Sequence, residues 1–563
     1  MWMEKPVGAY LIPALWMAPL AIISFYFAIL DPEWHHDGIL FKPAVDVASG
    51  LSLFRDTFTQ YGALTTYIQA GAIYLFGKYL IVLRLQAALF LVLIGFFNIL
   101  ILERLCPRWL AITSTYIWFF LAPIFILTFL PWSSIYALLF CTIGVWCLVL
   151  SVEKQHVTRP QFQLCFFAGI AMACGFWSRQ PVGIVFATTL LYFVAEIFDT
   201  TITKRIATFR ALTYVAGFVT VSTGILGWLY YDGALHDWWL QSIVAAHKFA
   251  EMVPNGLSLG NIIYNLFPSP NHVYLGNNSH IWQRLPVITL ATTCYAVICI
   301  FASKQRQRQN KSKFLLILCL SAIGSWHQYF PVPDIGHMFW AATPMIGLAI
   351  VFGYLLLSDL RLPSIAASTL VILISIAFFG RDIHYRIDEG MSRIPVGGLH
   401  LATLKGMRVT SSHISAQRYH STPESYRAEF KELNEVLTRL RQLDSGLALI
   451  SFTPDVYLTS ELALNNPHKI YPWWPWLFRL YPERKAQVIN FIRDNRPIIE
   501  VATVPWGGQD WSDPTNSARK RFGFSDYQVL ITLGYADWGS TQLLIPPELL
   551  VRYDARFPNE SVQ

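Results

Sequence analysis

Charged residues are scarce in this sequence. Asp, Glu, Lys and Arg make up 14% of its 563 residues, whereas a soluble globular protein carries roughly 25%. Hydrophobic residues account for 54% of the chain and aromatic residues for 15%. This composition excludes an ordinary soluble enzyme and indicates an integral membrane protein.

Nucleotide-binding motifs are absent as well. The sequence contains neither the phosphate-binding G-x-x-x-x-G-K-[ST] nor a G-x-G-x-x-G after a strand, and it contains no H-E-x-x-H metal motif. The net charge of +7 comes from basic residues scattered at the ends of apolar segments, which is a topology signal rather than a surface for nucleic acid. We therefore expect no nucleotide site and no nucleic-acid partner.

Cysteine is absent from the C-terminal part of the chain. The eight cysteines all occur in or beside apolar segments, none has C-x-x-C spacing, and none follows Cys319. The C-terminal part can therefore contain no disulfide and must be stable on its own hydrophobic core. The cysteines themselves are expected to pack as small apolar side chains.

Long apolar segments are what the chain does contain. The first has no small-residue cleavage site after it, so we expect it to be retained. Membrane-spanning helices are predicted for eleven segments, near residues 8–30, 81–103, 109–128, 134–151, 163–177, 182–198, 211–230, 286–303, 314–327, 338–357 and 364–380.

Basic residues mark one side of these segments. The run KQRQRQNKSK at 304–313 is the strongest cluster, and the positive-inside rule places it in the cytoplasm. The opposite face then receives the long loops 31–80 and 231–285 and the whole chain after residue 380. Apolar residues at helical spacing predict surface helices within the two loops, at 38–50, 61–77 and 234–252.

The composition becomes that of a soluble protein after residue 380. A helix, a strand, a second helix and a second strand are predicted there in that order, at 423–443, 447–453, 482–495 and 497–504. This alternation predicts a small α/β domain. We therefore divide the chain into a transmembrane module, 1–380, and an extracytoplasmic soluble domain, 381–563.

The first outer loop carries a group of ionisable residues directly after the first apolar segment: Asp31, Glu33, His35, His36 and Asp37. Such groups at the membrane edge mark functional sites when they face water or a cavity. Asp37 is the candidate general base, with Glu33 and His36 beside it. Two alternatives remain open: a zinc site formed by the histidines with one of the acids, and a polar loop that only marks the membrane edge.

Two further outer segments carry residues suited to a charged ligand. Arg179 and Gln180 occupy a short turn, and a guanidinium binds phosphate bidentately; the alternative is an ion pair with a loop acid. The segment 325–344 carries His327, Asp334 and His337 in proline-rich aromatic backbone, which is tolerated at membrane depth where it lines a cavity. The alternative there is a capped helix start with a surface acid.

Together these segments resemble the GT-C glycosyltransferases, especially the bacterial protein-O-mannosyltransferase and lipid A aminoarabinose-transferase type (family 39-like). Asp37, in HHDG, stands where those enzymes have an acid, and G-x-x-L-F-R-D-x-F-x-x-Y-G follows at 50–62. Arg179-Gln180-Pro181 is similar to their lysine-glycine-proline turn, and YFPVPDIGHMFWAATP (329–344) to their late outer segment. The similarity covers roughly residues 8–380.

Two features depart from that pattern. The first loop has HHD where the family often has Asp-Glu, and Pro131-Trp132-Ser133 in the second outer loop lacks the acid of many members. Glu33 or Asp31 therefore becomes a candidate for the second carboxylate.

The resemblance implies a GT-C-like fold and a hexosyl- or pentosyltransferase with a polyprenyl-phosphate sugar donor. Asp37 would accept the proton of the acceptor hydroxyl during an inverting attack. Arg179 would hold the departing phosphate with Gln180 and His337. The remaining residues that it places around the substrate cavity are His35, Arg55, Asp56, Tyr61 and Asp334.

The implied acceptor is an envelope glycan, lipid or protein at the periplasmic face of the bacterial inner membrane, with membrane lipid as a further partner. No cofactor is expected, and a divalent metal at the histidines is the alternative. Two rival functions remain. A transporter or flippase of lipid-linked saccharides would need paired repeats, which are not evident, and a polymerase or ligase would use lipid-diphosphate glycans.

Overall fold

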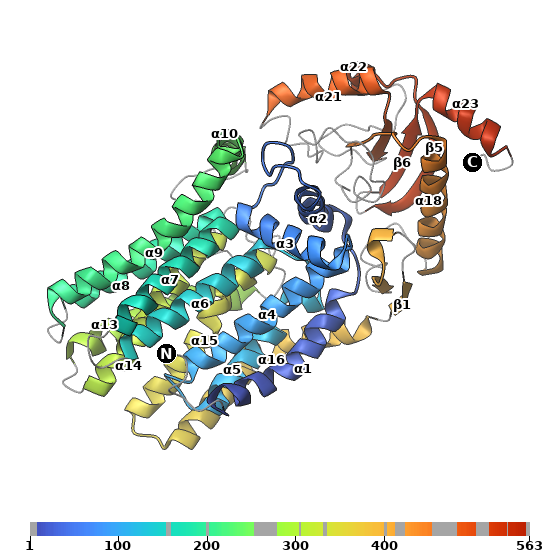
Figure 1. Ribbon diagram of the computed structural model, residues 1–563. Coiled ribbons are helices and arrows are strands. Elements are labelled where there is room, and N and C mark those ends of the chain that lie inside the picture. Colours follow the sequence, from blue (N-terminus) through green and yellow to red (C-terminus); the bar gives the residue numbers. More distant parts are fainter. Residues whose placement is uncertain are drawn as a thin grey trace.

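A computed structural model gives the fold for most of the chain. It describes residues 8–153, 159–198, 202–252, 279–302, 306–329, 335–393, 395–398, 402–410, 423–452, 481–502, 517–536 and 539–558. A helical bundle forms one end of the molecule, and a small sheet with its own helices covers the other end (Figure 1).

The bundle contains a helix for each of the eleven predicted apolar segments. In the described part of the chain these are α1 (Gly8–Ala28), α4 (Leu80–Leu102), α5 (Arg108–Phe120), α6 (Ser133–Glu153), α7 (Arg159–Ser178), α8 (Gly183–Ile197), α9 (Lys204–Tyr231), α13 (Ser279–Ala302), α14 (Arg306–Ser325), α15 (Ile335–Asp359) and α16 (Ser364–Ser392). Of the described helices, nine are long and apolar enough to cross a membrane. The other two are α5, with 13 residues, and α14, which begins inside the basic run. The predicted class, a polytopic α-helical membrane protein, is confirmed.

Glycine pairs allow the bundle helices to approach closely. A Cβ atom at Gly169 of α7 would lie 1.9 Å from the Tyr214 carbonyl oxygen of α9. A Cβ atom at Gly217 of α9 would lie 2.1 Å from the Phe166 carbonyl oxygen of α7. In lipid, the hydrophobic effect does not hold helices together. Small residues at such crossings let the backbones approach closely, so that van der Waals packing stabilises the pair.

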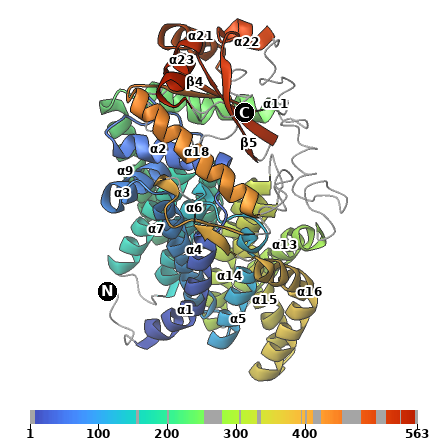
Figure 2. The same cartoon turned by 90° about the vertical axis from the view of Figure 1, so that its right-hand side faces the viewer.

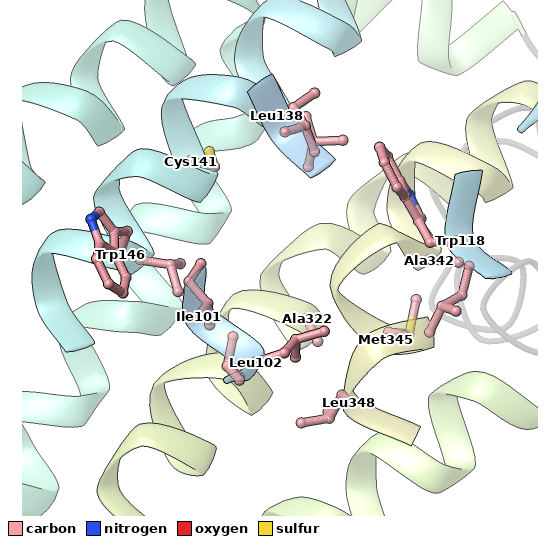
Figure 3. Close-up of a cluster of buried hydrophobic side chains, with 14 of the residues drawn as sticks. Ile101, Leu102, Trp118, Leu138, Cys141, Trp146, Ala322, Ala342, Met345 and Leu348 are labelled. Carbon is pink, nitrogen blue, oxygen red and sulfur yellow. The ribbon is translucent and has the colours of Figure 1, made fainter. Parts of the chain in front are cut away.

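Residues of α4, α5, α6, α14 and α15 come together in one part of the bundle core. Figure 3 shows its large apolar side chains, Trp118 and Trp146 among them. A cavity of about 40 Å³ lies within this region, and Ile101, Leu138 and Cys141 are part of its lining. Hydroxyl groups of serine and threonine residues line it too, so it has room and partners for a few water molecules.

The predicted surface helices lie at the sheet-bearing end of the bundle. They are α2 (Trp34–Ala48), α3 (Ala63–Phe76) and a continuous run of α10 (Leu235–Trp239), the π-helix η3 (Leu240–Val244) and α11 (Ala245–Met252). Three short helical turns, η1 (Pro123–Phe125), η2 (Gln180–Val182) and η5 (Trp326–Tyr329), connect bundle helices.

The C-terminal domain contains a four-stranded sheet of order β3-β4-β6-β5. Strands β3 (Leu449–Phe452) and β4 (Ile498–Ala502) are parallel, whereas β6 (Gly539–Ile545) pairs antiparallel with β4 and with β5 (Gln528–Ala536). Its helices are α18 (Pro423–Leu443), α21 (Pro482–Asn495), α22 (Ser517–Phe522) and α23 (Pro547–Arg556). The four predicted elements of this domain are therefore present.

One hydrophobic core joins this domain to the outer helices. Leu433 of α18 and Leu549 of α23 share a buried cluster with Phe41 of α2 and Leu80 of α4. Figures 1 and 2 show the domain beside α2. Helix α16 continues past the predicted boundary at residue 380 to Ser392 and leads directly into the small sheet of β1 (Pro395–Gly398) and β2 (Arg408–Thr410).

Asp31 ties the first helix to this junction. Its Oδ1 accepts the Thr410 backbone N–H at 2.7 Å, and its Oδ2 accepts the Thr410 hydroxyl at 2.9 Å and Arg393 Nε at 3.0 Å. Asp31 is fully buried and has a φ of 51°, so its backbone is held in a left-handed conformation by these contacts. Asp31 therefore belongs to the joint between bundle and domain, which weakens it as a candidate second carboxylate.

Candidate active site

A reciprocal cap fixes the start of α2, where the predicted catalytic residues lie. The Glu33 carboxylate accepts the His36 backbone N–H at 2.5 Å, and Asp37 Oδ2 accepts the Glu33 backbone N–H at 2.8 Å. Such a cap satisfies two otherwise unpaired donors of the first turn. It also holds the side chains of Glu33, His36 and Asp37 in one defined arrangement.

Asp37 is buried against an arginine of the bundle. Arg84 Nε of α4 donates to Asp37 Oδ1 at 3.1 Å, and Arg84 Nη2 pairs with Oδ2. Both side chains are fully buried, and Arg84 also donates to the carbonyl oxygens of Leu30 and Asp31. Burial raises the pKa of Asp37, and the Arg84 guanidinium opposes that rise. Asp37 thus holds the first loop on α4, and its catalytic role stays a prediction.

Glu33 and His36 face a different neighbourhood. The Glu33 side chain is 15% exposed, and its Oε2 lies 3.0 Å from His36 Nδ1. The edge of the His36 ring contacts Trp132, with ring centres 5.6 Å apart. Trp132 also contacts His337 at 5.3 Å. The second outer loop therefore links the first loop to the start of α15.

Gly62 brings the first loop to Arg179. A Cβ atom at Gly62 would lie 2.2 Å from the Trp177 carbonyl oxygen, so only glycine fits this approach. The Gly62 N–H donates to the Ser178 carbonyl oxygen at 3.2 Å. The preceding Tyr61 is thereby placed near both Arg179 and Glu33. Burial raises the pKa of Tyr61, Arg179 lowers it and Glu33 raises it further.

Arg179 lies beside the first turn of α6. Its Nη1 donates to Ser134 Oγ at 2.5 Å. The turn η2 that follows Arg179 contacts η5, which carries His327. The N-terminus of α6 and the guanidinium both favour an anion at this point.

Unpartnered polar atoms gather on the segments around Arg179. In the part of the chain that the structure describes, five buried side-chain atoms here have no hydrogen-bond partner: Ser133 Oγ, Ser178 Oγ, Gln180 Nε2, His327 Nε2 and Gln328 Oε1. Leaving a buried polar group unpaired costs roughly 1–3 kcal/mol. A concentration of such groups from three separate segments is what a site for a polar ligand provides.

The other predicted cavity residues have different surroundings. Arg55 pairs with Asp56 at 2.8 Å and donates to the Asp232 carbonyl oxygen at 2.6 Å, so these residues fasten the first loop to the end of α9. Asp334 and the side chain of His35 lie outside the described residues. No group of three potential metal ligands occurs among the described residues, and the zinc alternative that uses His35 stays a prediction.

Two residues of the site, Arg84 and Trp132, are not among those that the sequence motifs predict. Arg84 lies inside an apolar segment, and an arginine there signals a buried acidic partner. Trp132 lies between two histidines, His36 and His337, and no local sequence pattern indicates these contacts.

Comparison with known proteins supports the fold. No protein-family model matches the sequence, and no curated protein matches it. Among solved structures, ArnT from Cupriavidus metallidurans in the apo state is similar at 10% identity with a TM-score of 0.52, and the similarity covers 97% of this chain and 99% of ArnT. The oligosaccharyltransferase AglB from Archaeoglobus fulgidus, in complex with an inhibitory peptide and a dolichol-phosphate, aligns at 13% identity with a TM-score of 0.49 over 89% of this chain and 70% of AglB. The chain therefore shares the GT-C fold of ArnT.

Proposed function

We propose that this protein is a membrane glycosyltransferase that moves a hexosyl or pentosyl unit from a polyprenyl-monophosphate donor to a cell-envelope glycan, lipid or protein. The observation that carries the proposal is the group formed by Glu33, Tyr61 and Arg179, with unpartnered polar atoms around it. An acid and a fixed cation beside polar groups suit transfer of a hydroxylated sugar away from a phosphate. The GT-C fold agrees with this chemistry.

The proposed reaction uses Glu33 as the base. The acceptor hydroxyl gives its proton to the Glu33 carboxylate, and its oxygen forms a bond to the anomeric carbon on the face opposite the phosphate. The bond between that carbon and the phosphate oxygen breaks, and the electron pair leaves with the polyprenyl phosphate. Arg179 stabilises the charge on the departing group.

Glu33 takes this role because of its position relative to Asp37. Asp37 is fully buried and is held by Arg84, whereas Glu33 is partly exposed and lies near Tyr61. Asp37 then acts as a positioning residue, since it caps the Glu33 backbone N–H. His36 holds the Glu33 carboxylate as well, since its ring Nδ1 lies 3.0 Å from Glu33 Oε2.

The decisive experiment is a donor assay with the purified full-length protein in detergent. We expect sugar transfer from radiolabelled polyprenyl-monophosphate sugars and none from UDP- or GDP-sugars. The sequence lacks a nucleotide motif, and the single guanidinium of Arg179 suits one phosphate group. Transfer from nucleotide sugars alone would refute the mechanism, and transfer only from lipid-diphosphate glycans would favour a polymerase or ligase.

Arg179 variants provide the control for this assay. Arg179→Ala should lower turnover by about 10²–10³-fold, the usual effect of removing one preorganised donor. Arg179→Lys should recover only part of it, because lysine lacks the planar pair of donors. Arg381→Ala removes an exposed arginine of α16 and should leave turnover unchanged.

The proposed orientation places the site and the C-terminal domain on the periplasmic face of a bacterial inner membrane. Helix α14 supports it, since it begins in the basic run at Arg306 and ends at Ser325, next to η5. A reporter that is active only in the periplasm should therefore be active when fused after residue 563 and inactive when fused within 304–313. The reverse pattern would place the site in the cytoplasm.

A further inference from the structure

His327 has a defined tautomer. It lies in η5, between α14 and α15, and its Nδ1 is 2.8 Å from the Gly324 carbonyl oxygen. A carbonyl oxygen can only accept, so Nδ1 carries the hydrogen and donates it. The other ring nitrogen, Nε2, then presents a lone pair.

Nothing in the described chain donates to that lone pair. Nε2 of His327 is buried and has no hydrogen-bond partner. Burial, together with the charges of Arg179 and His337, lowers the pKa of His327 to about 4, while the Gly324 carbonyl opposes the change. The ring is therefore neutral at neutral pH, and Nε2 is an acceptor.

The turn that carries this acceptor lies beside the turn that follows Arg179. Turn η5 contacts η2, which begins at Gln180, and the Gln180 and Gln328 side chains also have buried unpartnered atoms. A buried acceptor without a donor is unfavourable in the free protein. A ligand beside Arg179 that donates a hydrogen bond to His327 Nε2 removes this free-energy cost.

We propose that His327 Nε2 accepts a hydrogen bond from a hydroxyl group of the donor sugar and thereby selects donors that carry this hydroxyl. The inference rests on the proposed function, since it names a contact within the same site. His327 is a positioning and specificity residue rather than the base, because a neutral imidazole of such low basicity accepts a hydrogen bond without taking the proton. Sites built to bind a substrate hydroxyl reject analogues that lack it, because their polar groups are then left unpaired.

Two substitutions separate this role from a structural one. His327→Asn places an amide nitrogen near the Nδ1 position, so it keeps the donor to Gly324 but has nothing at the Nε2 position. His327→Gln reaches the Nε2 position with an amide oxygen and loses the bond to Gly324. The exposed His384 of α16 offers a matched control, His384→Asn.

The expected kinetic result uses polyprenyl-monophosphate sugars and analogues that each lack one hydroxyl. His327→Asn should keep the apparent Tm but raise KM about tenfold, whereas His327→Gln should recover part of the KM. Wild-type protein should reject one deoxy analogue, and His327→Asn should no longer distinguish it from the parent sugar. Wild-type KM and unchanged discrimination in His327→Asn, with a lowered Tm in His327→Gln, would show a purely structural role.

A spectroscopic measurement tests the same contact without activity. In protein labelled with ¹⁵N-histidine, the signal lost in His327→Asn should show an unprotonated Nε2 at neutral pH. That signal should shift with a polyprenyl-phosphate sugar and stay unchanged with polyprenyl phosphate alone. A protonated Nε2, or equal shifts with both lipids, would overturn the inference. An inactive wild-type protein whose Nε2 signal still shifts with the sugar lipid would refute the transferase and keep the contact.

Discussion

Replacing Glu33 with glutamine is expected to lower turnover by about 10²–10⁴-fold, because a general base contributes that much. The substitution keeps a carbonyl oxygen that can accept the His36 backbone N–H, so the cap at the start of α2 should survive. We therefore expect the apparent Tm to stay near that of the wild type. Turnover with a saturating polyprenyl-monophosphate sugar and thermal unfolding in the same detergent measure the two effects.

Glu432→Gln is the matched control, since Glu432 is an exposed acid on α18, far along the chain from the site. It should change neither turnover nor Tm. If Glu33→Gln retained wild-type turnover, the base would have to be another acid, and Asp37 would be the first alternative.

Replacing Asp37 with asparagine is expected to destabilise the protein by about 3–5 kcal/mol, because it leaves the Arg84 charge buried without its partner. Asparagine has nearly the same shape as aspartate. It carries no charge to neutralise the Arg84 guanidinium, and its amide oxygen accepts weaker hydrogen bonds than a carboxylate does. A loss of stability is therefore expected beside any effect of this substitution on catalysis. Thermal or denaturant unfolding of the purified variant measures the loss.

A double variant identifies the cause. Adding Arg84→Met to Asp37→Asn removes both buried charges and should restore much of the lost stability, because a buried ion pair can be replaced by uncharged groups at little cost. The recovery should be incomplete, since Arg84 also donates to the Leu30 and Asp31 carbonyl oxygens. If the double variant lost as much stability as the sum of the losses in Asp37→Asn and Arg84→Met alone, the two residues would not be coupled.

Much of the architecture follows from local sequence patterns. Each predicted apolar segment forms a helix, and the predicted helix at 423–443 coincides with α18. Even the helix expected at 482–495 has those bounds in α21. The hydrophobic periodicity that predicts a helix or a strand is a property of a short stretch of sequence, so it can be recognised without knowing the fold. The resemblance to GT-C enzymes predicts how the bundle helices are arranged, and the structural similarity to ArnT supports that prediction.

The partners of the acids in the first loop are determined only by the tertiary structure. Asp31, Glu33 and Asp37 look alike in the sequence, yet one pairs with Arg393, one is partly exposed, and one pairs with Arg84. Arg393 follows Asp31 by 362 positions, so no local pattern connects them. Whether a carboxylate holds the fold or faces a ligand depends on which distant cation reaches it. That is a property of long-range packing, which the sequence of the loop does not contain.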